Sequence, residues 1–117
     1  MKLQVKRIYE EKERGDGMRI LVDRVWPRGM TKEAAALSAW HKDVAPSAEL
    51  RKWFGHDPAR WEEFKKRYRR ELDENEEKVA SLKKELGDRR ATLLYGARDE
   101  AHNHAFVLAD YLRGKKD

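Results

Sequence analysis

Charged residues gather in one stretch of the sequence, between Asp23 and Gly29, directly after a run of apolar residues. Arginine binds carboxylates and phosphates through paired hydrogen bonds, and glycine lets a backbone approach a ligand closely. The stretch therefore predicts an anion clamp formed by Arg24 and Arg28 beside Asp23, with Gly29 allowing that close approach. The alternative is that Asp23 and one arginine form a buried ion pair, since a buried carboxylate is costly unless it is paired.

A second group of polar residues follows the apolar run that ends at Tyr95. Arg98 precedes a predicted helix, and Asn103 and His104 lie near its start. The N-terminus of a helix favours anions through its unpaired N–H groups and the positive end of its dipole. His104 is predicted as a general acid or base at a cleft edge, or else as a buried structural histidine. Asn103 contributes to the same site or caps the helix.

The sequence predicts no metal site and no cofactor. His102 and His104 are two positions apart, and on a helix such residues point to nearly opposite sides. The absence of cysteine excludes disulfides, thiolate zinc sites, iron–sulfur clusters and a cysteine nucleophile. Asp23 and His104 are therefore the candidate catalytic groups.

The elements that must position these residues follow from periodicity and from turn residues. The predicted order is strand 3–9, strand 18–26, helix 34–40, helix 48–54, a long helix over 58–86 with a break near 73–75, strand 91–97 and helix 100–113. Strands separated by helices pair in parallel through right-handed crossovers. We therefore expect one α/β domain over residues 1–117, with a small, open, mostly parallel sheet of three to four strands and helices on its faces. Strand 3–9 should lie near an edge of the sheet and strand 18–26 inside it.

Ligands of open α/β sheets bind outside the carboxyl ends of the strands. This rule selects the loops that follow the three predicted strands. Arg7, Trp26 and Tyr95 lie at these strand ends and complete the expected ligand-binding set.

The balance of charge favours anionic partners, because 27 Lys and Arg face 22 Asp and Glu for a net charge of +5. Part of the excess lies on the long helix, at Lys65, Lys66, Arg67, Arg69 and Arg70, which could bind a nucleic acid backbone. Glu62 and Glu63 precede Lys66 and Arg67 by four positions, however, and such pairs mark a solvated helix face. Asn and Gln are scarce while Glu, Lys and Arg abound, a composition typical of heat-adapted proteins. No apolar run is long enough for a signal peptide or a membrane span, so a soluble, cytoplasmic protein is expected.

Several long motifs occur in the order found in a known family. They are Arg19-Ile-Leu-Val-Asp-Arg-Val-Trp-Pro-Arg-Gly29, Ser47-Ala-Glu-Leu-Arg-Lys52, Thr92-Leu-Leu-Tyr95 and Asn103-His-Ala-Phe-Val-Leu-Ala-Asp-Tyr-Leu112. Over nearly its whole length the chain resembles the YeaO-like branch of the domain-of-unknown-function 488 family. The resemblance implies a small α/β protein of bacteria or archaea, from a family of uncharacterised activity. The wider family carries cysteines where Tyr95 and Asn103 stand here, so any cysteine chemistry cannot be transferred to this chain.

These observations lead to one function and two alternatives, one of which is that the charged motifs are purely structural and that function depends on a partner. The chain is expected to bind a small anionic ligand, such as a phosphate-bearing one, at the carboxyl end of its sheet, with Asp23 and His104 as acid–base groups if it is an enzyme. The other alternative is a nucleic-acid-associated module that uses the basic long helix.

Overall fold

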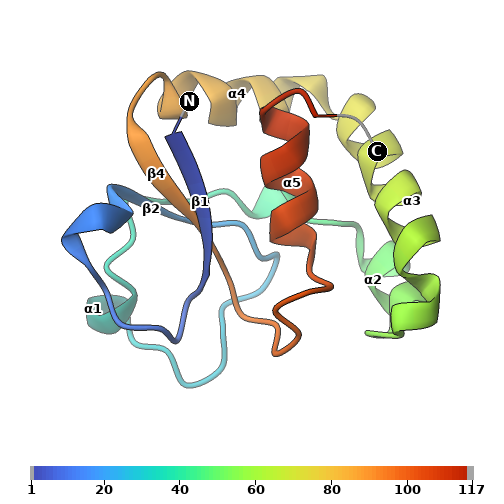
Figure 1. Cartoon of the computed structure of the whole chain (residues 1–117), viewed down its shortest axis with the longest axis horizontal. Coiled ribbons are helices and arrows are strands. Elements are labelled where there is room, and N and C mark those ends of the chain that lie inside the picture. Colours follow the sequence, from blue (N-terminus) through green and yellow to red (C-terminus); the bar gives the residue numbers. More distant parts are fainter. Residues whose placement is uncertain (1, 116–117) are drawn as a thin grey trace.

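The sheet of the protein is open and entirely parallel. In the computed structural model, which describes residues 2–115, four strands pair in the order β1-β4-β2-β3. The strands are β1 (Lys2–Arg7), β2 (Met18–Leu21), β3 (Ala39–Trp40) and β4 (Arg90–Tyr95), and every pair runs in parallel. The predicted α/β class with a small parallel sheet is confirmed, as are the edge position of β1 and the inner position of β2 (Figure 1).

The helices connect these strands and follow the last of them. They are α1 (Lys32–Ala35), α2 (Ala48–Phe54), α3 (Trp61–Asp73), α4 (Glu76–Leu86) and α5 (His104–Leu112), with short 3-10 turns at Arg14–Asp16, Lys42–Val44 and Pro58–Arg60. Helix α2 has the predicted bounds because both of its ends carry strong local signals. The Ser47 hydroxyl accepts the N–H of Leu50 at 3.1 Å, and Gly55 takes up a left-handed conformation with φ of 53°.

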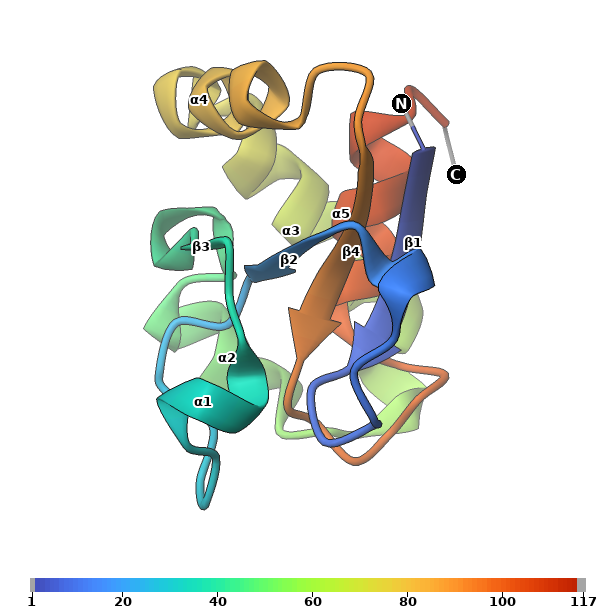
Figure 2. The same cartoon turned by 90° about the vertical axis from the view of Figure 1, so that its left-hand side faces the viewer.

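The two faces of the sheet are covered unequally. The larger core lies between the sheet and α2 to α5, whereas α1 and the chain around it cover part of the opposite face (Figure 2). Because side chains alternate along a strand, Leu93 and Tyr95 of β4 enter the larger core while Leu94 enters the smaller one. The smaller core consists of Ile8, Leu21, Ala35 and Leu94, with Trp26, Met30 and Leu37 packed against it.

The predicted helix 34–40 is wrong in extent. Helix α1 ends after one turn because Ala36 adopts a left-handed conformation with φ of 45°. The chain is then drawn into the sheet, where the N–H of Ser38 donates to the carbonyl of Arg19 at 2.7 Å and that of His41 to the carbonyl of Leu21 at 2.9 Å. Residues 39–40 thus form β3, and pairing with the neighbouring strand outweighs the helical pattern of the local sequence.

Other bounds differ by a few residues. Helix α5 begins at His104 instead of residue 100, because the Asp99 carboxylate accepts the N–H groups of Ala101 and His102 and so forms a turn ahead of the helix. Strand β2 ends at Leu21 instead of residue 26. The long predicted helix is divided into α3 and α4 at residues 74–75, inside the region where its apolar stripe lapses.

A buried ionic cluster links β1 to the start of β2. Lys6 of β1 lies 3.0 Å from the Asp16 carboxylate, which also pairs with Arg19 of β2, and all three side chains are almost fully buried. Burial alone would raise the pKa of Asp16, but hydrogen bonds from the Glu13 backbone, Lys6 and Arg19 outweigh it and lower that pKa. Burial alone would likewise lower the pKa of Lys6, and its bonds to Glu13 and Asp16 raise it. The cluster is a paired network that ties β1 to β2.

All four strands point the same way, so the chain leaves each of them at the same edge of the sheet. The segment that follows β2 and the segment that joins β4 to α5 meet there. Between residues 2 and 115, no helix is both long and apolar enough to cross a membrane.

Candidate functional site

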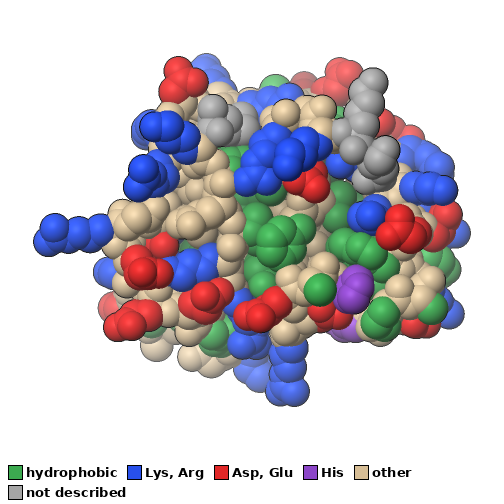
Figure 3. Space-filling model, in the orientation of Figure 1, with side chains coloured by type: hydrophobic (Ala, Val, Ile, Leu, Met, Phe, Trp, Pro, Cys, Tyr) green, Lys and Arg blue, Asp and Glu red, His purple; other side chains and the backbone are tan. Residues whose placement is uncertain are grey.

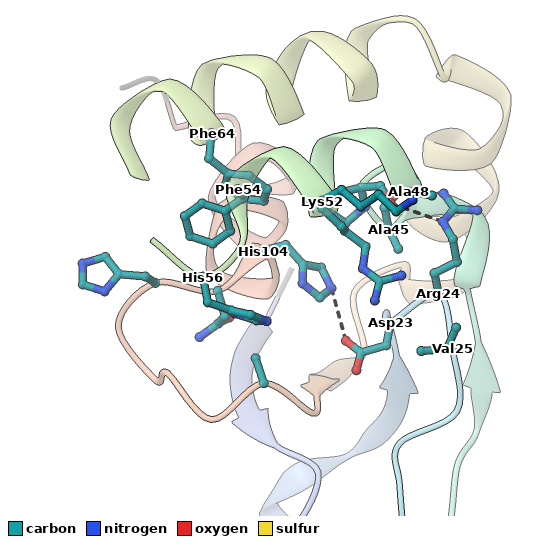
Figure 4. Close-up of a pocket in the computed structure, with 15 residues that line it drawn as sticks. Asp23, Arg24, Val25, Ala45, Ala48, Lys52, Phe54, His56, Phe64 and His104 are labelled. Atoms are coloured by element: carbon teal, nitrogen blue, oxygen red, sulfur yellow. Dashed lines mark hydrogen bonds and ion pairs between the residues drawn. The ribbon is translucent and has the colours of Figure 1, made fainter. Parts of the chain in front are cut away.

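A cavity of about 410 Å³ opens between α2 and the segments that follow β2 and β4. Its volume lies within the range of about 300–1,000 Å³ that is typical of small-molecule sites. Polar and apolar side chains both face it (Figure 4). The lining residues are Asp23, Arg24, Val25, Ala45, Pro46, Ala48, Arg51, Lys52, Phe54, His56, Phe64, Ala97, His102, Asn103 and His104.

Asp23 connects the two strand ends that border the cavity. Its Oδ2 accepts the N–H of Gly96, directly after β4, at 2.9 Å. Its Oδ1 lies 3.3 Å from Nε2 of His104, at the start of α5. A Cβ atom at position 96 would stand 3.1 Å from Oδ2, so the absence of a side chain there gives the carboxylate its room. Asp23 therefore occupies a place where two strands and a helix meet.

His104 is fixed by a backbone contact. Its Nε2 lies 2.9 Å from the carbonyl oxygen of Val22. Because a carbonyl can only accept, Nε2 carries the hydrogen, and Oδ1 of Asp23 accepts no hydrogen bond of its own. The His104 and Asp23 side chains are 15% and 16% exposed, so both are largely shielded from water. In the neutral imidazole, Nδ1 is then the nitrogen that can accept a proton.

Arg24 holds one wall of the cavity in place. Its Nε donates to the carbonyl of Pro46 at 3.2 Å, and one terminal nitrogen donates to the carbonyl of Ala45 at 3.1 Å. The same wall is held from behind by Tyr68, whose hydroxyl donates to the carbonyl of Val44 at 2.6 Å. Burial raises the pKa of Tyr68 well above its ordinary value, which keeps that hydroxyl a donor. Arg24 thus has a structural role, and its guanidinium retains further N–H donors.

Two cations of α2 also line the cavity, and the sequence interpretation did not include them. Arg51 and Lys52 are exposed residues in the last turn of α2, whose opposite side buries Leu50 and Phe54. The amphipathic pattern of this helix shows that both cations face away from the core. It does not show that the helix lies over the carboxyl edge of the sheet, which depends on tertiary packing.

Three histidines line the cavity, and each rests against an aromatic ring of the larger core. The ring centroids of His56 and Phe54 are 6.1 Å apart. The ring centroids of His102 and Trp61 are 5.3 Å apart, and those of His104 and Tyr68 are 6.1 Å apart.

His102 is half-buried. Its Nδ1 lies 2.9 Å from the Asp99 carboxylate. The hydrogen bond from the His102 backbone, followed by the bond from its ring, lowers the pKa of Asp99. Among residues 2–115, no group of three metal-binding side chains converges.

Asn103 is both a lining residue and the cap of α5. Its side-chain oxygen accepts the N–H of Phe106 at 3.3 Å, and its amide donates to the carbonyls of Asp99 and Glu100. The predicted capping role is therefore present.

The remaining candidates at the ends of β1 and β4 lie outside the lining. Arg7 donates to the carbonyl of Ala97 at 2.9 Å and covers the ring of Tyr9. Tyr95 is buried in the larger core, and Arg98 is exposed. Arg7 thus holds the segment that follows β4, and Tyr95 is a core residue.

The chain that follows Val25 leaves the lining of the cavity. Trp26 donates to the carbonyl of Met30 at 2.7 Å and packs against the smaller core, on the other face of the sheet. Arg28 is exposed, and its carbonyl accepts the Tyr9 hydroxyl. Gly29 has φ of 76°, nothing lies within 4 Å of the place where its Cβ would be, and it lies outside the lining of the cavity. Of the predicted site residues, the cavity brings together Asp23, Arg24, Asn103 and His104.

Comparison with known proteins places the chain among close relatives. A family model described as "Inactive DUF488-N3 subclade" matches residues 2–117. "Uncharacterized protein YeaO" of Escherichia coli is 44% identical over 113 residues, which cover 97% of this chain and 98% of the relative. "Uncharacterized protein Rv3073c" of Mycobacterium tuberculosis is 43% identical over 114 residues, which cover 97% and 96%. No solved structure matches the chain.

Proposed function

The chain belongs to the inactive DUF488-N3 subclade, and we propose that it binds a small anionic, phosphate-bearing ligand in the cavity beside α2. The observation that carries this proposal is the charge of the lining. Three cations, Arg24, Arg51 and Lys52, face the cavity together with one carboxylate, that of Asp23, so cations outnumber anions in the lining. A cleft lined by one sign of charge concentrates ligands of the opposite sign.

Asp23 and His104 serve this site first as positioning groups. The side chains of Asp23 and His104 form the polar floor of the cavity. Asp23 accepts the N–H of Gly96, and His104 donates to the carbonyl of Val22, so both side chains are fixed before a ligand arrives. A general acid–base role for the pair remains a prediction. The description of the subclade as inactive favours binding without turnover.

The proposal is tested by titrating the full chain with inorganic phosphate and following the backbone amide signals by NMR. We expect the lining amides to shift and to saturate. The double variant Arg51→Gln/Lys52→Gln should weaken binding by about tenfold, the effect of losing one or two charged hydrogen bonds. Arg28→Gln is the matched control, since it removes an exposed cation outside the cavity and should leave the affinity unchanged. Absence of saturable shifts in the wild-type chain would overturn the proposal.

The nucleic-acid alternative rests on the basic side chains of α3. Lys65 pairs with Glu62 at 3.2 Å, and Arg67 pairs with Glu63 at 3.0 Å. Arg67 also lies over the ring of Trp53 at 4.1 Å. Figure 3 shows cationic and anionic side chains interspersed on the face that it displays, including the side where α3 lies. Because these contacts favour a solvated ion-pair surface, the cavity remains the proposed site.

A further inference from the structure

We infer that the ligand of this cavity carries its anionic group on a planar ring. This inference rests on the proposed function, since it describes the rest of a molecule whose charged group that function already requires. It follows from the division of the lining into an aromatic part and a cationic part.

The aromatic part is formed by Phe54, Phe64 and His56. Phe54 and Phe64 stack with their ring centroids 4.4 Å apart, and His56 lies 6.1 Å from Phe54 on the other side. Both phenylalanines are held in the larger core, so this wall is rigid. Rings recognise one another through stacked or edge-on contacts at centroid distances of about 4.5–7 Å.

His56 is held at the rim in an uncommon backbone conformation. It has φ of 56°, one of two positive values among the non-glycine residues of the chain between residues 2 and 115. The neighbouring Gly55 is left-handed because it ends α2, and His56 follows directly in the same region. Such a conformation carries a cost in free energy unless the surroundings hold it. It places an exposed imidazole ring beside the buried phenylalanines.

The cationic part lies on the other side of the polar floor. In Figure 4, His56, Phe54 and Phe64 lie to one side of His104, and Arg24 and Lys52 lie to the other. Arg24 and Lys52 reach the cavity from different parts of the chain, the segment that follows β2 and the last turn of α2. A ligand that fills both parts must therefore have an apolar end and an anionic end.

The size of the cavity also requires more than a bare anion. It holds about 410 Å³, whereas one tetrahedral anion occupies the space of a few water molecules at about 30 Å³ each. An anion bound at the cations would leave the rest of the cavity, including the exposed residue His56, in contact with water. A planar ring attached to that anion displaces this water and covers the apolar surface. The class of ligand that fits is an aryl anion such as an aromatic phosphate monoester.

The test compares methyl phosphate with phenyl phosphate in the wild-type chain. The two probes share the monoester group and differ in the ring, so their ratio of dissociation constants isolates the ring. We expect phenyl phosphate to bind about tenfold tighter, as one favourable ring contact gives. Equal affinities would overturn the ring inference and leave the proposed function standing. Absence of binding by both esters and by inorganic phosphate would overturn the proposed function itself.

Two variants locate the ring. His56→Asn removes the imidazole and keeps a residue that tolerates the left-handed conformation, so the fold should be retained. It should reduce the phenyl-to-methyl ratio. Phe54→Leu preserves an apolar side chain in the core and should reduce the same ratio. A ratio that neither variant changes would overturn the assignment of the ring to this wall. Arg51→Gln/Lys52→Gln should weaken both esters by a similar factor, and a loss confined to phenyl phosphate would also contradict the inference.

Discussion

Oδ1 of Asp23 lies 3.3 Å from Nε2 of His104, and that nitrogen donates its hydrogen to the carbonyl of Val22. The two side chains come from the ends of different elements that are 81 positions apart in the chain. Through Oδ2, Asp23 also accepts the N–H of Gly96. The contact therefore joins the ends of β2 and β4 to the start of α5, and it sets the floor of the cavity.

Replacement of Asp23 should show how much this junction stabilises the fold. Asp23→Ala leaves the Gly96 N–H without its acceptor, and loss of one partner of a shielded hydrogen bond costs about 1–3 kcal/mol in the free energy of unfolding. Asp23→Asn keeps an oxygen that can accept this hydrogen, so its loss should be smaller. Urea denaturation of the two variants measures the difference. Equal stability of Asp23→Ala and the wild type would show that the junction contributes nothing.

A second prediction concerns the turn that brings β1 to β2. Gly17 has φ of 64°, and a Cβ atom there would lie 2.2 Å from the carbonyl oxygen of Arg90. Because both the conformation and the backbone contact exclude a side chain, Gly17→Ala should lower the free energy of unfolding by more than about 2 kcal/mol. Gly15→Ala is the control, since nothing lies within 4 Å of its Cβ position and its φ is not positive. The same midpoint for both variants in urea would contradict the prediction.

The sequence predicts the fold best where a local signal and the tertiary contacts agree. Ser47 and Gly55 bound α2 as expected, and Asn103 caps α5. The sequence fails at residues 39–40, where apolar spacing suits a helix and pairing with β2 makes a strand. A two-residue edge strand has no periodicity that a sequence could reveal.

The candidate site was predictable in part for a similar reason. Asp23 and His104 follow a strand and begin a helix at the sheet edge where ligands bind, so position alone selects them. Arg28 is only five residues from Asp23, yet it is exposed outside the cavity because Trp26 packs on the opposite face of the sheet. Arg51 and Lys52 reach the cavity through the packing of α2, which no spacing in the sequence encodes.

The buried cluster of Lys6, Asp16 and Arg19 predicts a specific loss of stability in acid. The pKa of Asp16 is lowered in the folded protein from an ordinary value of 3.8. Its contribution to stability is therefore present above that unfolded value and is lost as the pH falls through the folded one. Asp16→Asn should cost about 3–5 kcal/mol near neutral pH, because it leaves Lys6 and Arg19 without their counterion.

Urea midpoints measured from pH 7 down to pH 2 check this prediction. The difference between the wild type and Asp16→Asn should be largest at neutral pH and should shrink as Asp16 becomes protonated in the wild type. Asp88→Asn alters an exposed carboxylate and should change stability by less than about 0.5 kcal/mol. A difference between the wild type and Asp16→Asn that does not change with pH would exclude an electrostatic origin.

We expect the basic helix α3 to bind nucleic acid weakly, with an affinity that depends only slightly on salt concentration. Its cations Lys65 and Arg67 are paired with Glu62 and Glu63, so few are free to replace the counterions of a duplex. The logarithm of the binding constant for unrelated duplexes should fall with the logarithm of the salt concentration with a slope no steeper than about −2, which corresponds to about two phosphate contacts. Fluorescence anisotropy of a labelled duplex measures the slope. A slope near −5 would mean about five or six phosphate contacts, more than this paired surface can supply, and would favour the nucleic-acid alternative over the cavity.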